Sequence, residues 1–403
     1  MTAAPLDGIR VLDLSRVLAG PWCSMTLADM GADVIKIESL EGDDTRSWGP
    51  PFIERGNHKL SAYFSCVNRN KRSVAVNLKD PKGQDIVHRL ARQADVLLEN
   101  FKTGGAEKLG VGYEQLRTEN PALVYCSISG YGRTGSKAHV PGYDFIIQAE
   151  AGLMSITGPS GGKPYKVGMA VADITTGMNA TTGILAALFA RTRSGKGQHI
   201  DISLYDTQLQ WLGNVASNVL FSGHDARRWG NNHANIVPYQ MFEAAENTWL
   251  VVACGNDGQW RHLCTILGKP EWQTDPKYAT NPARVTNRDD LTPMLQKIFL
   301  TRPAAAWLKD IDAAGIPCGH VRTVKEAIDD PLTTERGMRL HMHQPVLDTD
   351  IPLLGSALHF SETPVRYHSA PPVTGQHTEE VLGELGLSRD DIRALERDKI
   401  IGL

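Results

Sequence analysis

A single carboxylate, Asp173, stands at the point where a long run of apolar and small residues begins. It lies in the segment GMAVADITTG (168–177), and the run continues through residues 178–191. An Asp at the start of a helix is commonly its N-cap, because the carboxylate accepts hydrogen bonds from the free N–H groups of the first turn. The same position suits an anionic nucleophile, since these N–H groups stabilise developing negative charge. The two interpretations are compatible, and the rest of the chain has to decide whether the second applies.

Short apolar segments in the first half of the chain alternate with helical segments. The predicted strands cover residues 9–14, 32–38, 73–78, 95–100 and 123–129, and helices are predicted between them, as at 22–31 and 83–93. Strands that alternate with helices form a parallel sheet, because the chain must cross back before each new parallel strand. We therefore expect an α/β fold with a Rossmann-like, doubly wound parallel sheet.

Polar residues stand at the carboxyl ends of these strands. They are Arg16, Glu38, Asn100 and the turn from Ser129 to Tyr131. Ligands of open α/β sheets bind beyond this edge. The first strand is not followed by GxGxxG, so NAD or FAD is not expected there, and the chain has no GxxxxGK[ST] loop.

The composition excludes several classes of partner. The 403 residues include 42 basic and 45 acidic side chains, for a net charge of −3 and no long run of one sign, so neither nucleic acid nor a membrane surface is expected as partner. The N-terminal residues lack the pattern of a secretory signal, and no apolar run approaches the roughly 20 residues that span a bilayer. The six scattered cysteines, without CxxC spacing, predict buried free thiols, no metal site and a cytoplasmic location.

The character of the sequence changes after residue 222. The segment 224–241 is polar, rich in Asn and irregular, and the segment after 330 contains several prolines before two predicted helices. We expect a large Rossmann-like domain that begins with residues 1–222, a smaller α/β domain over 223–330, and a C-terminal segment, 331–403, that returns to the large domain.

Nine short motifs follow one another along nearly the whole chain. They are PLDGIRVLDL (5–14), GADVIKIE (31–38), NKRS (70–73), ENF (99–101), SGYG (129–132), AD (172–173), GKGQ (195–198), GIPCG (315–319) and GQHT (375–378). In this order they resemble the class III CoA-transferases, the family of formyl-CoA transferase and carnitine CoA-transferase. GDDTRSWGPP (42–51) and RWGNNHANIVPYQ (228–240) are most similar to the succinyl-CoA:glutarate branch. The resemblance implies a homodimer whose two subunits interlock.

The resemblance also implies a role for Asp173. The Asp of the Ala-Asp motif is the family's nucleophile, which forms first a mixed anhydride and then an aspartyl-CoA thioester. The substrates would be an acyl-CoA, such as succinyl-CoA, and a free carboxylic acid, such as glutarate. No permanently bound cofactor and no metal are implied, but water must be kept away from the anhydride.

Binding roles are carried over in the same way. The residues expected to contact CoA are Arg16, Asn77, Leu78, Lys79, Asn100, Phe101, Lys108, Ser129 and Tyr131. Those expected near the acyl group are Arg46, Trp48, Tyr143, Arg228 and His233. Arg46, Arg228 and His233 are candidates for binding a second carboxylate of the acceptor. Leu18 stands where formyl-CoA transferase has Gln, which favours an acyl group larger than formate or oxalate.

Two other functions remain open at this stage. An α-methylacyl-CoA racemase would share the fold, but that group places a catalytic His in a Gly-His-Asp motif. The matching residue here is Tyr143, whose ordinary pKa near 10 makes it a poor base for removing an α-proton. A CoA-binding protein without catalysis is the third possibility, and the presence of Asp173 argues against it.

Overall fold

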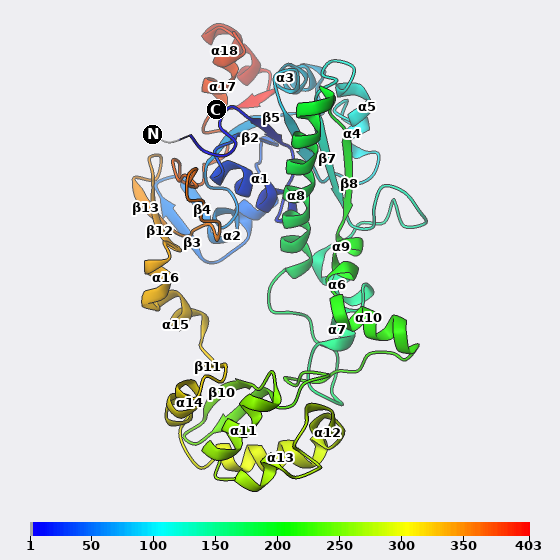
Figure 1. Cartoon of the computed structure of the whole chain (residues 1–403). Helices are drawn as coiled ribbons and strands as arrows, with labels where there is room; N and C mark the ends of the chain where they lie inside the picture. The colour runs from blue at the N-terminus through cyan, green and yellow to red at the C-terminus, as the bar shows by residue number, and fades with distance from the viewer. Residues whose placement is uncertain (1–2) are drawn as a thin grey trace. The chain divides into compact units, whose positions relative to one another are not determined.

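A seven-stranded sheet, formed among residues 3–403 that the computed structural model describes, organises the larger of two units (Figure 1). Unit 1 comprises the chain up to Leu153 together with Val167–Ser222 and Leu332–Leu403. Unit 2 comprises Met154–Lys166 and Gly223–Pro331. The expected domain ranges did not include the first of these two segments in the smaller unit.

The sheet of unit 1 is parallel apart from one edge. Its strands, in order across the sheet, are β14 (Ile401–Gly402), β5 (Lys71–Val76), β2 (Asp33–Glu38), β1 (Arg10–Asp13), β6 (Val96–Glu99), β7 (Val124–Ser129) and β8 (His199–Ser203). Neighbours from β5 to β8 pair in parallel, whereas β14 pairs with β5 antiparallel. The parallel α/β fold predicted from the sequence is therefore confirmed.

Helices cover both faces of this sheet. One face packs against α3 (Pro81–Ala91), α4 (Gly105–Lys108), α5 (Tyr113–Leu116), α17 (Thr378–Glu384) and α18 (Arg389–Arg397). The other packs against α1 (Ala19–Asp29), α6 (Asp144–Glu150), α8 (Val171–Ser194) and α9 (Leu204–Gln210). Successive strand residues point to opposite faces, so Val11 joins the second layer and Leu12 the first. This arrangement explains why apolar residues occupy adjacent positions along the strands, as Val11 and Leu12 do.

Helices α1 and α8 approach each other closely, and α8 is the long green helix beside α1 in Figure 1. A Cβ atom added at Gly177 would lie 2.5 Å from the backbone oxygen of Ala19 and 3.0 Å from Cβ of Trp22. Glycine at this position therefore sets the distance between the two helices. Because Asp173 lies in the first turn of α8, this contact also helps to fix the position of Asp173 relative to the sheet.

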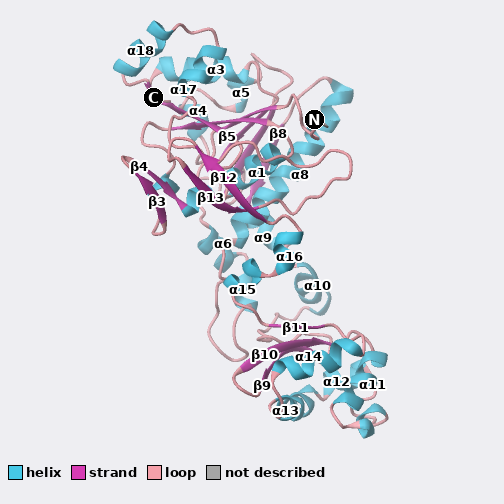
Figure 2. Cartoon of the chain, turned by 90° about the vertical axis from the view of Figure 1, so that its left-hand side faces the viewer, coloured by secondary structure: helices cyan, strands magenta, loops and turns pink. Residues whose placement is uncertain are grey.

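Unit 2 has an antiparallel sheet of its own, drawn in magenta in Figure 2. Its strands are β11 (Cys318–His320), β10 (Thr248–Ala253) and β9 (Tyr239–Ala244). Helices α11 (Asp257–Ile266), α12 (Asn281–Thr286), α13 (Arg288–Phe299) and α14 (Ala304–Ala313) complete the unit. Its core is rich in aromatic residues, including Trp260, Phe299 and Trp307.

The C-terminal segment returns to unit 1, where α17 packs on β5 and β14 extends the sheet. Two hairpins, β3 (Phe52–Arg55) with β4 (His58–Ser61) and β12 (Arg339–Gln344) with β13 (Thr349–Leu354), contribute to a smaller hydrophobic cluster. The remaining short elements are α2 (Ala62–Ser65), α7 (Leu153–Ile156), α15 (Val324–Asp329), α16 (Pro331–Glu335) and the 3-10 helices Asp44–Ser47 and Pro270–Gln273.

Residues 204–222 form two helices and not one continuous helix. Helix α9 ends at Gln210 and α10 (Gly213–Ser222) follows, because Gly213 adopts a positive φ of 51° that a continuous helix does not allow. Within the part of the chain that the structure describes, no helix has both the length and the apolar character needed to cross a bilayer.

Candidate active site

Asp173 lies in the first turn of α8 and does not cap it. The N-cap position is taken by Ala170, which offers no side-chain hydrogen bond. The expectation that Asp173 caps this helix is therefore wrong. The cap comes from another helix, since Oδ1 of Asp144, the first residue of α6, accepts a 2.7 Å hydrogen bond from the backbone N–H of Ala172.

The buried side chain of Gln148 holds Asp144 in this position. Its Nε2 donates to Oδ2 of Asp144 at 2.7 Å and to the backbone oxygen of Met169 at 3.3 Å. Its Oε1 accepts from the backbone N–H of Val167 at 2.8 Å. Gln148 therefore ties α6 to the segment that leads into α8.

The carboxyl group of Asp173 is partly buried and lacks a hydrogen-bond donor among residues 3–403. Burial, aided by the negative charge of Asp144, raises the pKa of Asp173 from 3.8 to about 7. A position at the start of a helix, which favours the ionised form, therefore does not keep Asp173 fully ionised. Near neutral pH the protonated and ionised forms coexist, and the ionised form is a poorly solvated, reactive carboxylate.

A pocket adjoins Asp173 at the carboxyl edge of the parallel sheet. Its lining comes mainly from the loops after β1, β6 and β7 and from the segment before α6, and comprises Arg16, Val17, Leu18, Ala19, Asp44, Asn100, Phe101, Lys102, Thr103, Ile128, Ser129, Gly130, Ala138, His139, Val140, Pro141, Gly142, Tyr143, Asp173 and Leu204. Gly130 and Gly142 touch in this wall, since a Cβ on Gly130 would lie 2.6 Å from Cα of Gly142. The pocket is where an open α/β sheet binds its ligand.

Asn100 holds the backbone of the loop after β1. Its Oδ1 accepts from the N–H of Arg16 at 2.9 Å, and its Nδ2 donates to the oxygen of Arg16 at 2.7 Å. The guanidinium of Arg16 is half exposed and lies 3.4 Å from the carboxylate of Asp44. The side chain of Arg16 therefore remains accessible to an anionic ligand, while its backbone is fixed.

The buried side chain of Glu99, at the end of β6, fixes the loop that follows this strand. Oε2 of the buried Glu99 accepts from the N–H of Phe101 at 2.7 Å, and Arg133 donates to Oε1 at 3.1 Å. Thr103, in the same loop, has a buried hydroxyl for which no hydrogen-bond partner exists in the described part of the chain. On the neighbouring loop, the hydroxyl of Ser129 accepts from the N–H of Gly132 at 3.0 Å.

Several residues expected to contact CoA do not line this pocket. Oδ1 of Asn77 accepts from the N–H of Lys79 at 3.1 Å, and the oxygen of Leu78 accepts from Gln84 at 3.0 Å, so these residues form the turn between β5 and α3. Lys79 and Lys108 are exposed. The hydroxyl of Tyr131 donates to Glu150 at 2.8 Å. Their contacts with CoA stay predictions.

Arg46 is bound within unit 1. Its Nε and Nη2 donate to the two oxygens of the buried Glu38 at 2.8 and 2.6 Å, and its Nη1 donates to the oxygen of Pro372 at 2.9 Å. The guanidinium also lies 3.7 Å from the centre of the Phe64 ring. These contacts occupy Arg46 as a structural cation, and its predicted role towards a substrate carboxylate has no support from the pocket lining.

Of the two aromatic residues expected near the acyl group, Tyr143 lines the pocket and Trp48 does not. Tyr143 lines the pocket and is exposed. Trp48 packs edge-on against Tyr63, with 5.0 Å between ring centres. Burial raises the pKa of Tyr63 to about 12, and the negative charge of Asp173 contributes to this shift.

The other two predicted substrate residues belong to unit 2. Arg228 donates to the backbone oxygens of Ser155 and Gly162 at 2.9 and 2.5 Å. His233 accepts from the N–H of Asn235 at 3.1 Å and packs against Tyr239. Their roles in substrate binding stay predictions.

The sequence analysis missed some of the residues around Asp173. Lys102 and Thr103 could have been found, because they directly follow Phe101 at a strand end. His139 and Tyr63 are different, since no motif or spacing connects either of them with Asp173. Only the folded structure brings His139 into the pocket lining and shows that Asp173 affects the pKa of Tyr63, which lies in α2.

Comparison with known proteins decides the family. Residues 6–378 match the family model described as CoA-transferase family III. The chain belongs to this family. Such enzymes exchange coenzyme A between carboxylic acids, so the protein is a CoA-transferase that acts on CoA thioesters.

The relatives cover almost the whole chain. A succinate–glutarate CoA-transferase of Agrobacterium fabrum is 46% identical over 384 residues, which are 94% of this chain and 96% of the relative. A succinyl-CoA:glutarate CoA-transferase of Mus musculus is 43% identical over 394 residues, 98% of this chain and 88% of the relative. The crystal structure of a CAIB/BAIF family protein from Brucella suis has a TM-score of 0.86 at 43% identity and covers 96% of this chain and 100% of that chain.

Proposed function

We propose that this CoA-transferase moves coenzyme A from succinyl-CoA to a free dicarboxylate such as glutarate, with Asp173 as the nucleophile. The observation that carries the proposal is the placement of Asp173, without a hydrogen-bond donor, in a pocket built from the ends of parallel strands. The names of the two glutarate CoA-transferases, both above 40% identity, support the choice of substrates.

The proposed reaction has two halves. The ionised carboxylate of Asp173 attacks the thioester carbonyl of succinyl-CoA, the C–S bond breaks, and the CoA thiolate leaves behind a mixed anhydride. The thiolate then attacks the aspartyl carbonyl of that anhydride, and succinate leaves. In the second half the carboxylate of glutarate attacks the aspartyl-CoA carbonyl, the C–S bond breaks, and the CoA thiolate leaves an aspartyl-glutaryl anhydride. The thiolate then attacks the glutaryl carbonyl, which forms glutaryl-CoA and releases the carboxylate of Asp173. One thioester replaces another, so no ATP is consumed.

The surroundings of Asp173 fit these steps. A carboxylate that water does not solvate well gains nucleophilicity, and the same exclusion of water protects the anhydride from hydrolysis. The guanidinium of Arg16 and the ammonium of Lys102 are accessible in the pocket and suit the phosphates of CoA. Trp48, which packs against Tyr63, is proposed to contact the acyl group.

An interlocked homodimer is part of the proposal. Large apolar side chains are exposed on contacting helices of unit 1, among them Phe189 of α8, Leu209 of α9, and Leu220 and Phe221 of α10. The exposed fraction reaches 95% for Phe221, and burial of such side chains in a subunit interface would remove their apolar surface from water. Light scattering coupled to gel filtration would test the dimer, and a monomer at micromolar concentration would contradict it. We also propose a cytoplasmic location, which the six free thiols support.

The decisive experiment is an acceptor panel. Purified protein is incubated with succinyl-CoA and, in separate reactions, glutarate, malonate, oxalate, butyrate or mesaconate, without ATP, and new CoA thioesters are identified by mass spectrometry. We expect glutaryl-CoA to form fastest. A protein that forms no CoA thioester from any acid would overturn the proposal, and uptake of deuterium at the α-carbon of 2-methylacyl-CoA would favour a racemase instead.

A further inference from the structure

Val17 adopts a backbone conformation that its side chain disfavours. Its φ is +70°, in the left-handed region, which β-branched residues rarely occupy. Strained residues of this kind persist only where their surroundings fix them, and they concentrate at functional sites. Val17 lies between Arg16 and Leu18, and these three residues line the pocket together with Asp173.

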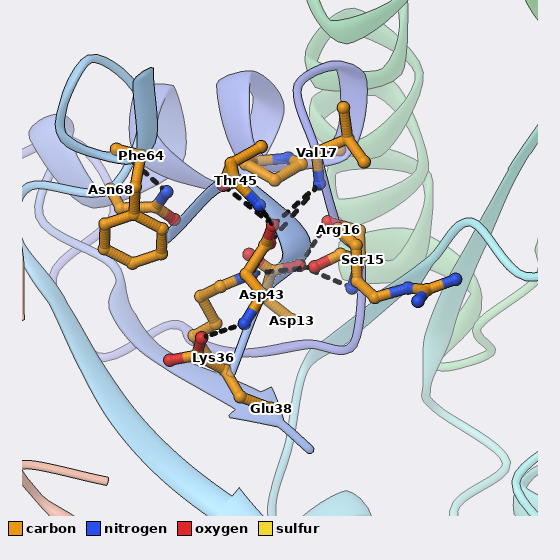
Figure 3. Close-up of polar contacts among 12 residues, drawn as sticks. Asp13, Ser15, Arg16, Val17, Lys36, Glu38, Asp43, Thr45, Phe64 and Asn68 are labelled. Atoms are coloured by element: carbon orange, nitrogen blue, oxygen red, sulfur yellow. Dashed lines mark hydrogen bonds and ion pairs between the residues drawn. The ribbon is translucent and has the colours of Figure 1, made fainter. Parts of the chain in front are cut away.

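The buried carboxylate of Asp43 holds this conformation. Oδ2 and Oδ1 of Asp43 lie 3.3 and 3.4 Å from the backbone nitrogen of Val17, which donates to them (Figure 3). Oδ1 also accepts from the N–H of Thr45 at 3.0 Å and from its hydroxyl at 2.8 Å. Asp43 thus connects the strained residue to the 3-10 helix that follows β2.

A buried ammonium holds both Asp43 and the loop. Nζ of Lys36 lies 3.0 Å from Oδ2 of Asp43 and donates to the backbone oxygen of Ser15 at 2.8 Å. Both side chains of this ion pair are completely buried. Asp13 also fixes this loop, which follows β1. Its Oδ1 accepts from the N–H and the hydroxyl of Ser15 at 2.9 and 2.5 Å.

We propose that Asp43 and Lys36 are positioning residues for CoA transfer, which fix Val17 in the left-handed conformation and thereby place Leu18 beside Asp173. The inference rests on the proposed function, because it requires Asp173 to react in this pocket. Arg16 is held separately by Asn100, so the two anchors have separable effects. Asp43 fixes the backbone of Val17, next to Leu18, whereas Asn100 fixes the backbone of Arg16, the residue proposed to bind CoA.

The alternative is that this ion pair only stabilises the fold, and Asp29 offers a matched control. Asp29 and Arg69 form another buried pair in unit 1, at 2.5 Å and less than 5% exposed, which does not touch the loop. We expect both Asp43→Asn and Asp29→Asn to lower Tm. Only Asp43→Asn should lower kcat, by roughly 10- to 100-fold, as for a displaced reacting group, with KM for succinyl-CoA changed less than about threefold. Asp29→Asn should keep kcat within about twofold.

A second variant tests whether strain at Val17 is the reason. Glycine occupies the left-handed region without steric penalty, so Val17→Gly removes the need for an anchor. We expect Asp43→Asn to reduce kcat less than about threefold when it is introduced into Val17→Gly, compared with its larger effect in the wild type. An equal loss in both backgrounds, or a folded Asp43→Asn variant with wild-type kcat, would overturn the inference.

Should Asp43→Asn fail to fold, Thr45→Val provides the test. It removes one hydrogen bond to Asp43 and leaves every charge in place, so we expect a loss in kcat of about 3- to 10-fold, again suppressed by Val17→Gly. Wild-type kcat in Thr45→Val would contradict the inference. If the wild type transfers CoA and these variants have the same kcat as the wild type, the positioning role is wrong but the proposed function stands. A wild-type protein that transfers no CoA overturns the proposed function and this inference with it.

Discussion

The carboxylate of Asp144 accepts a hydrogen bond from Ala172, the residue that directly precedes Asp173. One acidic side chain therefore caps the helix that carries the other, and it also places a negative charge near it. The hydrogen bond favours a fixed start for α8, whereas the charge disfavours ionisation of Asp173. Asp144 thus acts on the position of Asp173 through a hydrogen bond and on its ionisation through charge.

Replacement of Asp144 by Asn should shift the pH dependence of the reaction. Oδ1 of Asn can still accept from Ala172, although its Nδ2 faces Nε2 of Gln148 and that hydrogen bond is lost. The negative charge is also lost, so the pKa of Asp173 should fall from about 7. Because the ionised form attacks, kcat/KM for succinyl-CoA should rise with pH through this pKa, and the variant's rise should lie about one pH unit lower. Glu150→Gln, on the same helix, is the control, and an unshifted profile in Asp144→Asn would contradict the assignment.

Asp173→Asn should abolish activity and yet stabilise the protein at alkaline pH. The pKa of Asp173 is raised from 3.8 to about 7, so between these values the folded protein retains a proton that the unfolded chain has lost. The contribution of Asp173 to stability is therefore greatest at low pH and is lost as pH rises towards 7. We expect kcat to fall at least about 1000-fold. The free energy of unfolding at pH 8 should rise by about 2 kcal/mol, since one pKa unit corresponds to about 1.4 kcal/mol before solvent screening.

The stability measurement has its own control. The same denaturant titration at pH 5 should show a smaller gain, because there the wild-type side chain is still mostly protonated in the folded state. An equal gain at both pH values would point to a packing effect and would contradict the raised pKa.

Gly177→Ala should separate α1 from α8. The new methyl group would lie 2.5 Å from the backbone oxygen of Ala19, which cannot move without disturbing α1. We expect the free energy of unfolding to fall by about 2–3 kcal/mol, as for an overpacked core, together with a loss of activity. Gly183→Ala on the same helix meets nothing closer than 3.5 Å and should be neutral or stabilising by up to about 1 kcal/mol. Equal effects of the two substitutions in chemical denaturation would refute the steric explanation.

Arg46→Met should act on stability and not on substrate preference. It leaves the buried Glu38 without its partner, which we expect to destabilise unit 1 by about 3–5 kcal/mol. The ratio of kcat/KM for glutarate to that for butyrate should stay within about twofold, because Arg46 does not line the pocket. A stable variant that no longer prefers the dicarboxylate would restore the role that the sequence suggested.

The parallel sheet of unit 1 could be predicted because its signals are local. Each of β1, β2, β5, β6 and β7 is a short apolar segment that a helix or loop separates from the next, and the polar ends of β1, β6 and β7 meet at one edge. Asp173 could be singled out in the same way, since the Ala-Asp motif and the helix after it are contiguous in the sequence.

The features that escaped prediction depend on partners far away in the chain. The N-cap was misplaced because the group that caps α8 comes from Asp144, 28 residues earlier. The raised pKa of Asp173 was missed because burial and that neighbour act only in the folded protein. Arg46 looked available for a substrate, since neither its carboxylate partner nor its contact with Pro372 can be recognised from spacing.

The antiparallel strand β14 has a consequence for biosynthesis. It covers the edge of β5, although β5 ends at Val76 and β14 begins at Ile401. During synthesis β5 leaves the ribosome early, and the backbone groups on its outer edge stay unpaired until β14 has been translated. During that interval it is open to pairing with another nascent chain, a hazard that ends only when β14 has been translated.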